Sequence, residues 1–155
     1  MQEIVIIGTR PACPRCQLLY NAITQMVGEM GIEATISHFA YTDMESATYV
    51  SASGLQAGTA KDVAKKIGVE IDFERMSRLE YNEAIEENNE YKRFNNCNWS
   101  FELDLFLRPI ERRAQEAGII MTPILIINHK LKNMGSIPRL KQIEEWLSEI
   151  SPARN

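Results

Sequence analysis

Cysteine is scarce in this sequence, with only three among 155 residues. So few cysteines, in an odd number, exclude a small secreted scaffold held together by several disulfides. Long hydrophobic runs are also missing. Met1-Gln2-Glu3 leads into a short apolar run, without the basic flank or the length of a signal peptide or a membrane helix. We therefore expect a cytoplasmic protein with no membrane partner.

An excess of positive charge is missing as well. The chain has 17 basic and 21 acidic side chains, a net charge of −4, without long runs of either sign. This charge argues against nucleic acid as the main partner. The length of 155 residues and the hydrophobic fraction of 45% predict one globular domain, residues 1–155, with a single core.

The N-terminal part predicts a strand, a helix and a second strand. Residues 4–7 form a continuous apolar run, typical of a strand buried on both faces, and Gly8-Thr9 ends it. A helix is expected to start at Pro14, because apolar residues follow at helical spacing, namely Leu19, Ile23, Met26, Val27 and Met30. Residues 34–39 alternate like a strand, so a right-handed crossover would make the two strands parallel.

The C-terminal part predicts a β-hairpin and a closing helix. Residues 124–127 and the segment from Leu131 flank Asn128-His129, a plausible two-residue turn. A closing helix is marked by one apolar face, made of Leu140, Ile143, Leu147 and Ile150. We expect Trp146 to pack at its edge.

A shorter helix is predicted before the hairpin, at about residues 110–117. Pro109 would lie in its first turn and Gly118 just after its end.

The middle of the chain, about residues 42–107, is too long for a loop and predicts an inserted helical segment. Thr59 and Asp62 resemble a capping box, while Tyr81, Ile85 and Tyr91 suggest a second, charged helix. Asparagines at 88, 89, 95, 96 and 98 would mark exposed turns. A dense apolar stretch is expected to form the core of the insertion rather than a peptide site; it comprises Trp99, Phe101, Leu103 and Phe106.

Cys13-Pro14-Arg15-Cys16 is the motif that carries chemistry. Unpaired N–H groups and the dipole at a helix N-terminus favour a thiolate, so the pKa of Cys13 should be lowered. Two intervening residues bring Cys16 one turn further on, within reach of a mixed disulfide on Cys13. Cys13 would therefore be the nucleophile and Cys16 the resolving thiol. Arg10 and Arg15 add positive charge beside them, or are ordinary solvated side chains.

Taken together, this motif between a strand and an amphipathic helix, followed by Met121-Thr122-Pro123 before a hairpin and a helix, resembles the thioredoxin and glutaredoxin superfamily. Pro14 is similar to the proline of glutaredoxins, whereas Ala12 stands where thioredoxins have tryptophan. The resemblance implies a cis peptide bond before Pro123 that exposes the backbone of Thr122 to a substrate strand. Without the cysteines upstream, Pro123 would read as the start of an edge strand.

The resemblance implies an α/β fold, a thioredoxin-like three-layer sandwich with a mixed four-stranded sheet. Its core would be residues 1–41 and 108–155, with the insertion of about 42–107 after the second strand. The implied activity is reduction or isomerisation of disulfides in proteins or small thiols. Electrons would come from a separate reductase, and no bound cofactor is needed. Arg10, Arg15, Thr122 and Pro123 would bind the substrate.

Two other functions stay open. A carrier of soft metal or metalloid ions could use Cys13 and Cys16, with Cys97 as a further ligand, and a noncatalytic adaptor could use the insertion to hold a partner. Structural zinc usually needs four ligands, and only Cys97, His38 and His129 remain, without a second close pair. We assign none of these three a role.

The insertion is expected to be anchored beside the active site at both ends. Parallel strands joined by a crossover end at the same edge of a sheet, so the chain leaves the second strand near Cys13 and returns before Thr122. The insertion would then be a helical cap that narrows access to Cys13. A remote stabilising or dimerising lobe is the alternative.

Overall fold

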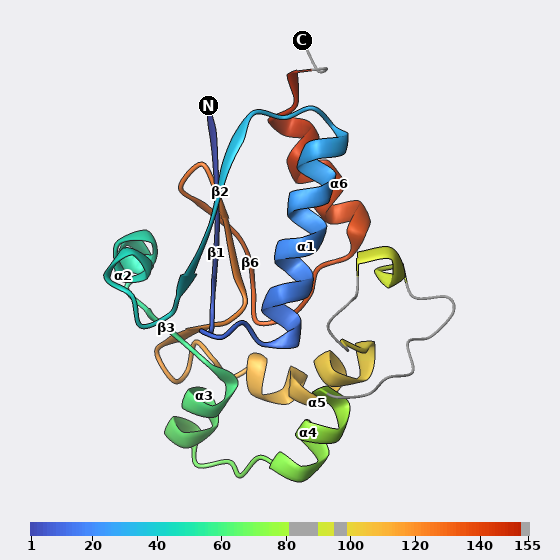
Figure 1. The fold of residues 1–155 in the computed structure, drawn as a ribbon. Coiled ribbons are helices and arrows are strands. Elements are labelled where there is room, and N and C mark those ends of the chain that lie inside the picture. Colours follow the sequence, from blue (N-terminus) through green and yellow to red (C-terminus); the bar gives the residue numbers. More distant parts are fainter. Residues whose placement is uncertain (81–89, 95–98, 153–155) are drawn as a thin grey trace.

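The structure is a computed structural model, and it describes residues 1–80, 90–94 and 99–152. Figure 1 shows the chain as an α/β fold. Its elements in order are β1 (Gln2–Gly8), α1 (Pro14–Glu29), β2 (Ala34–Ala40), α2 (Met44–Val50), β3 (Gln56–Gly58), α3 (Ala60–Ile67), α4 (Phe73–Glu80), α5 (Phe101–Glu111), β4 (Ile119–Met121), β5 (Ile124–Ile127), β6 (Lys130–Met134) and α6 (Leu140–Glu149).

The unit β1–α1–β2 forms as the sequence predicts. Every residue from Ile4 to Ile7 is completely buried, which explains the unbroken apolar run of β1. The two strands are parallel, with Gln2 opposite Ala34 and Gly8 opposite Ala40. Both strands therefore end at the same edge of the sheet, and α1 begins at that edge.

The predicted mixed four-stranded sheet is confirmed, in the order β2-β1-β5-β6. β5 runs antiparallel to β1 and to β6, so β5 and β6 form the expected hairpin. Its turn consists of Asn128 and His129, whose φ angles of 49° and 66° are both positive. Two consecutive positive φ values are typical of a type I′ turn, which matches the twist of the flanking strands.

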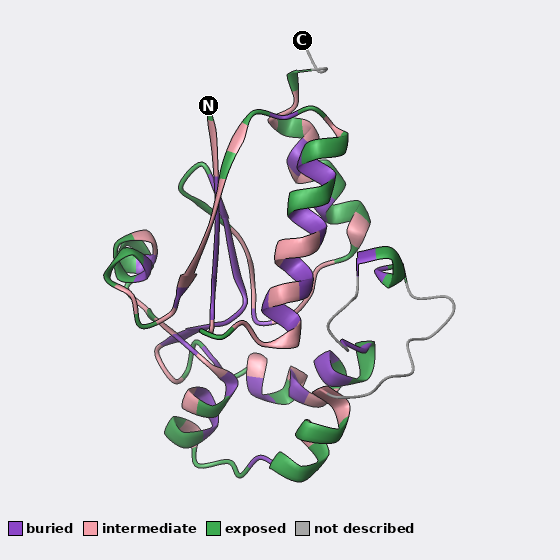
Figure 2. Cartoon of the chain, viewed as in Figure 1, coloured by how far each residue is buried: buried purple, intermediate pink, exposed green. Residues whose placement is uncertain are grey.

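Different elements cover the two faces of this sheet. Ile4 and Ile6 point towards α1 and α6, whose buried residues include Leu19 and Leu147. Val5 belongs to a second cluster on the opposite face, which contains Val50 of α2. Figure 2 shows the central strands buried between these layers.

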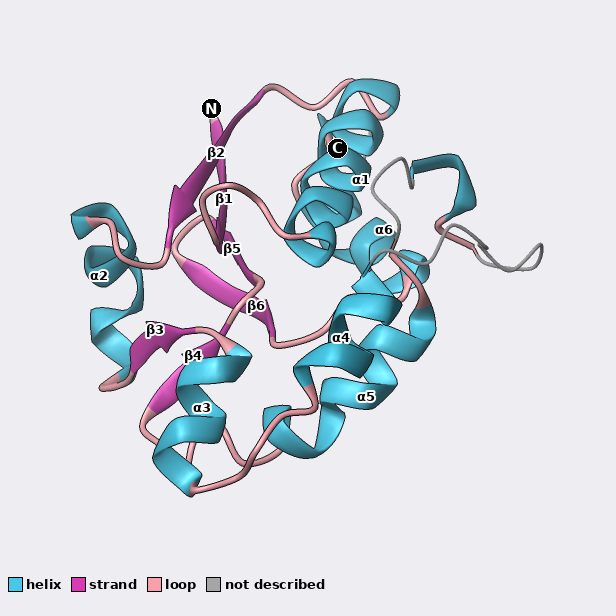
Figure 3. Ribbon diagram, turned by 60° about the horizontal axis from the view of Figure 1, so that its bottom comes forward, coloured by secondary structure: helices cyan, strands magenta, loops and turns pink. Residues whose placement is uncertain are grey.

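The insertion is not wholly helical, because it contains the short strand β3. β3 pairs in parallel with β4, with Gln56 opposite Ile119 and Gly58 opposite Met121. The sequence analysis did not predict this second sheet, since Gln-Ala-Gly has neither β-branched residues nor alternation. Figures 1 and 3 show α3, α4 and α5 grouped at the edge of the main sheet where α1 begins.

The helix predicted at residues 110–117 was wrong in its position. The helix is α5, Phe101–Glu111, and the chain after it turns until Gly118, which has a φ of 75°. Pro109 lies inside the last part of α5 rather than in a first turn. There it removes only the N–H that would reach the carbonyl of Leu105, a residue on the exposed side.

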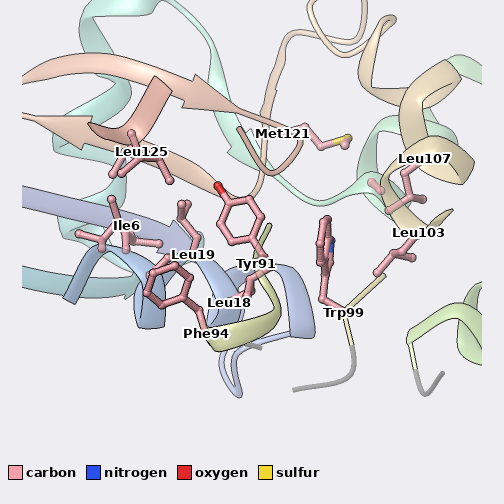
Figure 4. Close-up of a cluster of buried hydrophobic side chains, with 14 of the residues drawn as sticks. Ile6, Leu18, Leu19, Tyr91, Phe94, Trp99, Leu103, Leu107, Met121 and Leu125 are labelled. Carbon is pink, nitrogen blue, oxygen red and sulfur yellow. The ribbon is translucent and has the colours of Figure 1, made fainter. Parts of the chain in front are cut away.

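Helix α5 packs into the main core, so the predicted apolar stretch is largely buried. Figure 4 shows Trp99 and Leu103 beside Tyr91, which in turn lies next to residues of α1. The Tyr91 hydroxyl donates a hydrogen bond to the carbonyl of Pro138. Phe101 is exposed, unlike Trp99, whereas Trp146 packs against the core as expected.

The predictions for Tyr81, Ile85, Cys97 and the asparagines at 88, 89, 95, 96 and 98 lie outside the described residues. Among the residues that are described, no helix is both long and apolar enough to cross a membrane.

Candidate functional site

Cys13 is the N-cap residue of α1. Its backbone is extended, with φ −70° and ψ 165°, and Pro14 occupies the start of the helix as predicted. The Sγ atom of Cys13 accepts a hydrogen bond from the backbone N–H of Cys16 at 3.4 Å. The sulfur thus replaces the side-chain oxygen that usually caps a helix, at the end where the dipole favours negative charge.

The two sulfur atoms of the motif face each other. Their separation is 3.1 Å, and both thiols are free. Cys13 is partly exposed, whereas Cys16 has 0% of its surface accessible. One helical turn therefore places an outer thiol that a reactant can reach next to an inner thiol that is shielded from solvent.

The two thiols have pKa values shifted in opposite directions. The pKa of Cys13 is lowered to about 6, mainly because the Cys16 thiol donates a hydrogen bond to its thiolate; the Cys16 N–H and the Arg15 charge add to this. The pKa of Cys16 is raised, because its proton is held by that hydrogen bond and because its sulfur is buried. At pH 7 the site therefore holds one thiolate and one thiol.

The reactivity of Cys13 gives a first prediction. The rate of alkylation of Cys13 by iodoacetamide should rise with pH to a midpoint of about 6 and then level off. At pH 7 about nine tenths of Cys13 would be thiolate, compared with about 3% for an ordinary cysteine. Mass mapping after brief labelling at several pH values measures this.

The matched control for this titration is Cys16→Ala, which removes the donor that contributes most to the shift. The midpoint for Cys13 should then move upward. A wild-type midpoint near 8.5, or faster labelling of Cys16 or Cys97, would contradict the assignment of Cys13 as the nucleophile.

Thr9 holds the loop before the motif, a role that the sequence analysis missed. Its Oγ1 accepts a hydrogen bond from the Cys13 N–H and donates one to the Pro11 carbonyl, each at 2.9 Å. The Arg10–Pro11 peptide bond in this loop is cis, which was not predicted. A small hydroxyl residue four positions before the first cysteine was the available signal.

The peptide bond between Thr122 and Pro123 is cis, as the resemblance implied. The expected exposure of the Thr122 backbone is not found. Thr122 is buried, and its N–H donates a 2.9 Å hydrogen bond to the carbonyl of Gly58, at the end of β3. The Thr122 N–H is therefore already bonded to the insertion.

Arg15 takes part in a buried network with Asp104 of α5. Arg15 and Asp104 are 5% and 1% exposed, and Arg15 Nε lies 2.7 Å from Asp104 Oδ1. Arg15 also donates to the Gly135 carbonyl, and the second oxygen of Asp104 accepts the Ile137 N–H at 2.9 Å. Contact of Arg15 with substrate stays a prediction, and in the structure its guanidinium is held inside the protein.

Arg10 remains at the surface, with its side chain 64% exposed. It forms a two-pronged ion pair with Asp43, at 2.8 and 3.3 Å. Asp43 in turn accepts the Ala40 N–H, and these bonds together lower the pKa of Asp43.

A cleft of about 790 Å³ opens at Cys13. One wall is the loop of residues 9–15, and Thr122 also lines it. The opposite walls belong to the insertion and comprise Thr42, Thr59, Ala60, Lys61, Asp62, Met76, Glu80 and Leu107. Thr59 and Asp62 form the predicted capping box of α3, so the start of this helix is fixed at the rim.

Gly8 makes room for Cys16 at the end of β1. A Cβ atom at Gly8 would lie 2.4 Å from the Cys16 Sγ and 2.9 Å from its Cβ. Because Cys16 is held in the first turn of α1, Gly8→Ala should lower the free energy of unfolding by about 1–3 kcal/mol. Urea unfolding of the reduced protein measures the change.

Gly28→Ala is the matched control, because nothing lies within 4 Å of a Cβ at Gly28 inside α1. This variant should gain about 0.5–1 kcal/mol. Equal stability of the Gly8→Ala protein and the wild type would show that Gly8 is not needed for the close approach.

The described residues contain no group of three or more His, Cys, Asp or Glu side chains placed to hold a metal ion. Comparison with known proteins adds no family, since no protein-family model, curated protein or solved structure matches this chain. The site is therefore interpreted from its own chemistry.

Proposed function

We propose that this chain is a thioredoxin-like thiol-disulfide oxidoreductase with Cys13 as nucleophile and Cys16 as resolving thiol. The observation that carries the proposal is the pair of free sulfur atoms 3.1 Å apart at the N-terminus of α1, one partly exposed and the other buried. A partly exposed thiol with a pKa of about 6 is the kind that reacts with disulfides near neutral pH.

The proposed cycle has two exchange steps. The Cys13 thiolate attacks a substrate disulfide, one substrate sulfur leaves as a thiolate, and a mixed disulfide with Cys13 forms. The Cys16 sulfur, after losing its proton, attacks Cys13, and the second substrate sulfur leaves. The substrate disulfide gains two electrons and two protons as two thiols, and the protein is left with a Cys13–Cys16 disulfide. A dithiol reductant then restores both thiols.

The insertion is proposed to restrict which disulfides reach Cys13. Helices α3 and α4 contribute Lys61, Met76 and Glu80 to the cleft, so the approach to Cys13 is bounded on the side away from α1. A cleft of about 790 Å³ lies within the range of small-ligand sites, which is about 300–1000 Å³. It suits a small disulfide or a single protruding loop better than a broad protein surface.

The test measures disulfide reduction with dithiothreitol as the electron donor. The protein should accelerate the reduction of oxidised glutathione above the rate with dithiothreitol alone, and should accelerate insulin reduction less. Mass spectrometry should find the oxidised protein two hydrogens lighter, with Cys13 and Cys16 linked. No acceleration with either substrate would exclude the proposed activity, whereas equal acceleration would exclude only the restriction by the insertion.

Two further experiments on the same protein distinguish the two other functions from the proposed one. A soft-metal carrier would have its Cys13 protected from alkylation by stoichiometric zinc or copper(I). A noncatalytic adaptor would form no reversible disulfide across a range of dithiothreitol redox buffers.

A further inference from the structure

His38 lies beside the buried sulfur of Cys16. It stands on β2 opposite Ile6 of β1, and both side chains lie on the face of the sheet that α1 covers. A Cβ placed on Gly8 would meet both the Cys16 Sγ, at 2.4 Å, and the His38 Nε2, at 3.1 Å. The sulfur and the ring nitrogen therefore share the space that the missing side chain of Gly8 leaves open.

The Nε2 atom of His38 is buried and has no hydrogen-bond partner within the part of the chain that the structure describes. A pocket of about 150 Å³ lies next to it, lined by Ala12, Cys16, Gln17, Tyr20 and His38. A buried nitrogen without a partner costs stability, so such atoms are rare unless they have a use. The Cys16 thiol lines the same pocket.

We propose that His38 is the proton acceptor for Cys16 in the resolving step, an inference that rests on the proposed oxidoreductase function. Cys16 must lose its proton before it attacks Cys13. Once Cys13 forms a mixed disulfide, its sulfur is no longer a thiolate, so it no longer accepts the hydrogen bond from the Cys16 thiol. The Cys16 proton passes to His38 Nε2, the Cys16 thiolate attacks the Cys13 Sγ, and the substrate sulfur leaves with its electron pair.

The proton that His38 takes from Cys16 is released again before the next cycle. Protonated His38 returns the proton to the leaving substrate thiolate or, through the adjoining pocket of about 150 Å³, to solvent, and the ring is neutral again for the next cycle. No further reactant is needed beyond the dithiol that reduces the new disulfide.

The charges around His38 keep the ring in the accepting form. Its pKa is lowered, first by burial and then by Arg10, and only Asp43 opposes this. Tyr20 on α1 faces the ring with a centroid distance of 6.3 Å. His38 is therefore neutral at pH 7, and in the tautomer with hydrogen on Nδ1 its Nε2 can take a proton.

The experiment uses the two-step release of thionitrobenzoate from Ellman's disulfide, followed by stopped-flow absorbance in a Cys97→Ser background. The first release reports attack by Cys13, and the second reports attack by Cys16. His38→Gln should leave the first phase unchanged and slow the second by about 100-fold at pH 7, the usual contribution of a general base. His129→Gln is the matched control, since its ring is 77% exposed in the hairpin turn, and it should alter neither phase.

The pH profile separates proton transfer from a structural effect. In the wild type the second phase should become independent of pH above the lowered pKa of His38, whereas in His38→Gln it should rise tenfold per pH unit between 6 and 8. Arg10→Gln should shift the wild-type plateau to higher pH, because it removes a positive charge that lowers the His38 pKa. This second variant tests the inference even if His38→Gln does not fold.

Two outcomes would overturn the inference. One is a second phase of equal rate and equal pH dependence in the wild type and His38→Gln. The other is a wild-type second phase that already rises tenfold per pH unit. Absence of the first phase would instead refute the proposed function, so the two failures are distinguishable.

Discussion

Replacing Cys13 by serine is expected to abolish disulfide reduction, with a loss of at least about 1000-fold, because an enzyme that loses its nucleophile loses most of its catalysis. The reason is that, of the two cysteines that the structure describes, Cys13 is the one that combines partial exposure with a pKa of about 6. A serine hydroxyl at the N-cap would preserve the helix start, because serine is itself a good N-cap residue. The expected loss therefore reports chemistry rather than folding, and the dithiothreitol-driven assay measures it.

Cys16→Ser should behave differently, because it keeps the nucleophile and removes the resolving thiol. After mixing with oxidised glutathione, this variant should gain the mass of one glutathione on Cys13 and hold it until dithiothreitol is added. Wild-type protein should carry no lasting adduct. Equal activity of Cys13→Ser and the wild type, or an adduct that forms on Cys97 instead, would refute the assignment of roles.

Asp104→Asn is expected to lower the free energy of unfolding by about 3–5 kcal/mol, because it leaves the buried Arg15 guanidinium without its counter-charge. One carboxylate oxygen of Asp104 accepts a hydrogen bond from Arg15, and the other accepts one from the Ile137 N–H. In either orientation, the amide introduced by Asp104→Asn would therefore point its NH₂ group at one of these two donors. Chemical denaturation gives the change, and the loss should also loosen the contact between α1 and α5.

Glu116→Gln is the matched control, since it makes the same carboxylate-to-amide change in an exposed pair with Arg113. Its cost should stay below about 1 kcal/mol. The double variant Arg15→Met with Asp104→Leu should be less destabilised than Asp104→Asn, because no unpaired charge remains buried. Similar small losses for Asp104→Asn and Glu116→Gln would show that the buried pair does not hold α5 in place.

Local sequence patterns determined the elements that build the main sheet. The apolar run of residues 4–7, the proline and spacing of α1 and the alternation of residues 34–39 reflect forces that act within a few residues. For the same reason the capping box at Thr59 and the turn at Asn128 were predictable. The prediction that Cys13 starts a helix with a lowered pKa also needed no more than the motif and its flanks.

Tertiary structure alone decided how distant segments complete the site. Asp104 lies 89 residues from Arg15, and nothing near either residue signals that they would pair. The bond from Thr122 to Gly58 and the approach of His38 to Cys16 likewise depend on which strands become neighbours. The three residues of β3, Gln-Ala-Gly, carry no strand pattern of their own, so pairing with β4 rather than local preference makes them a strand.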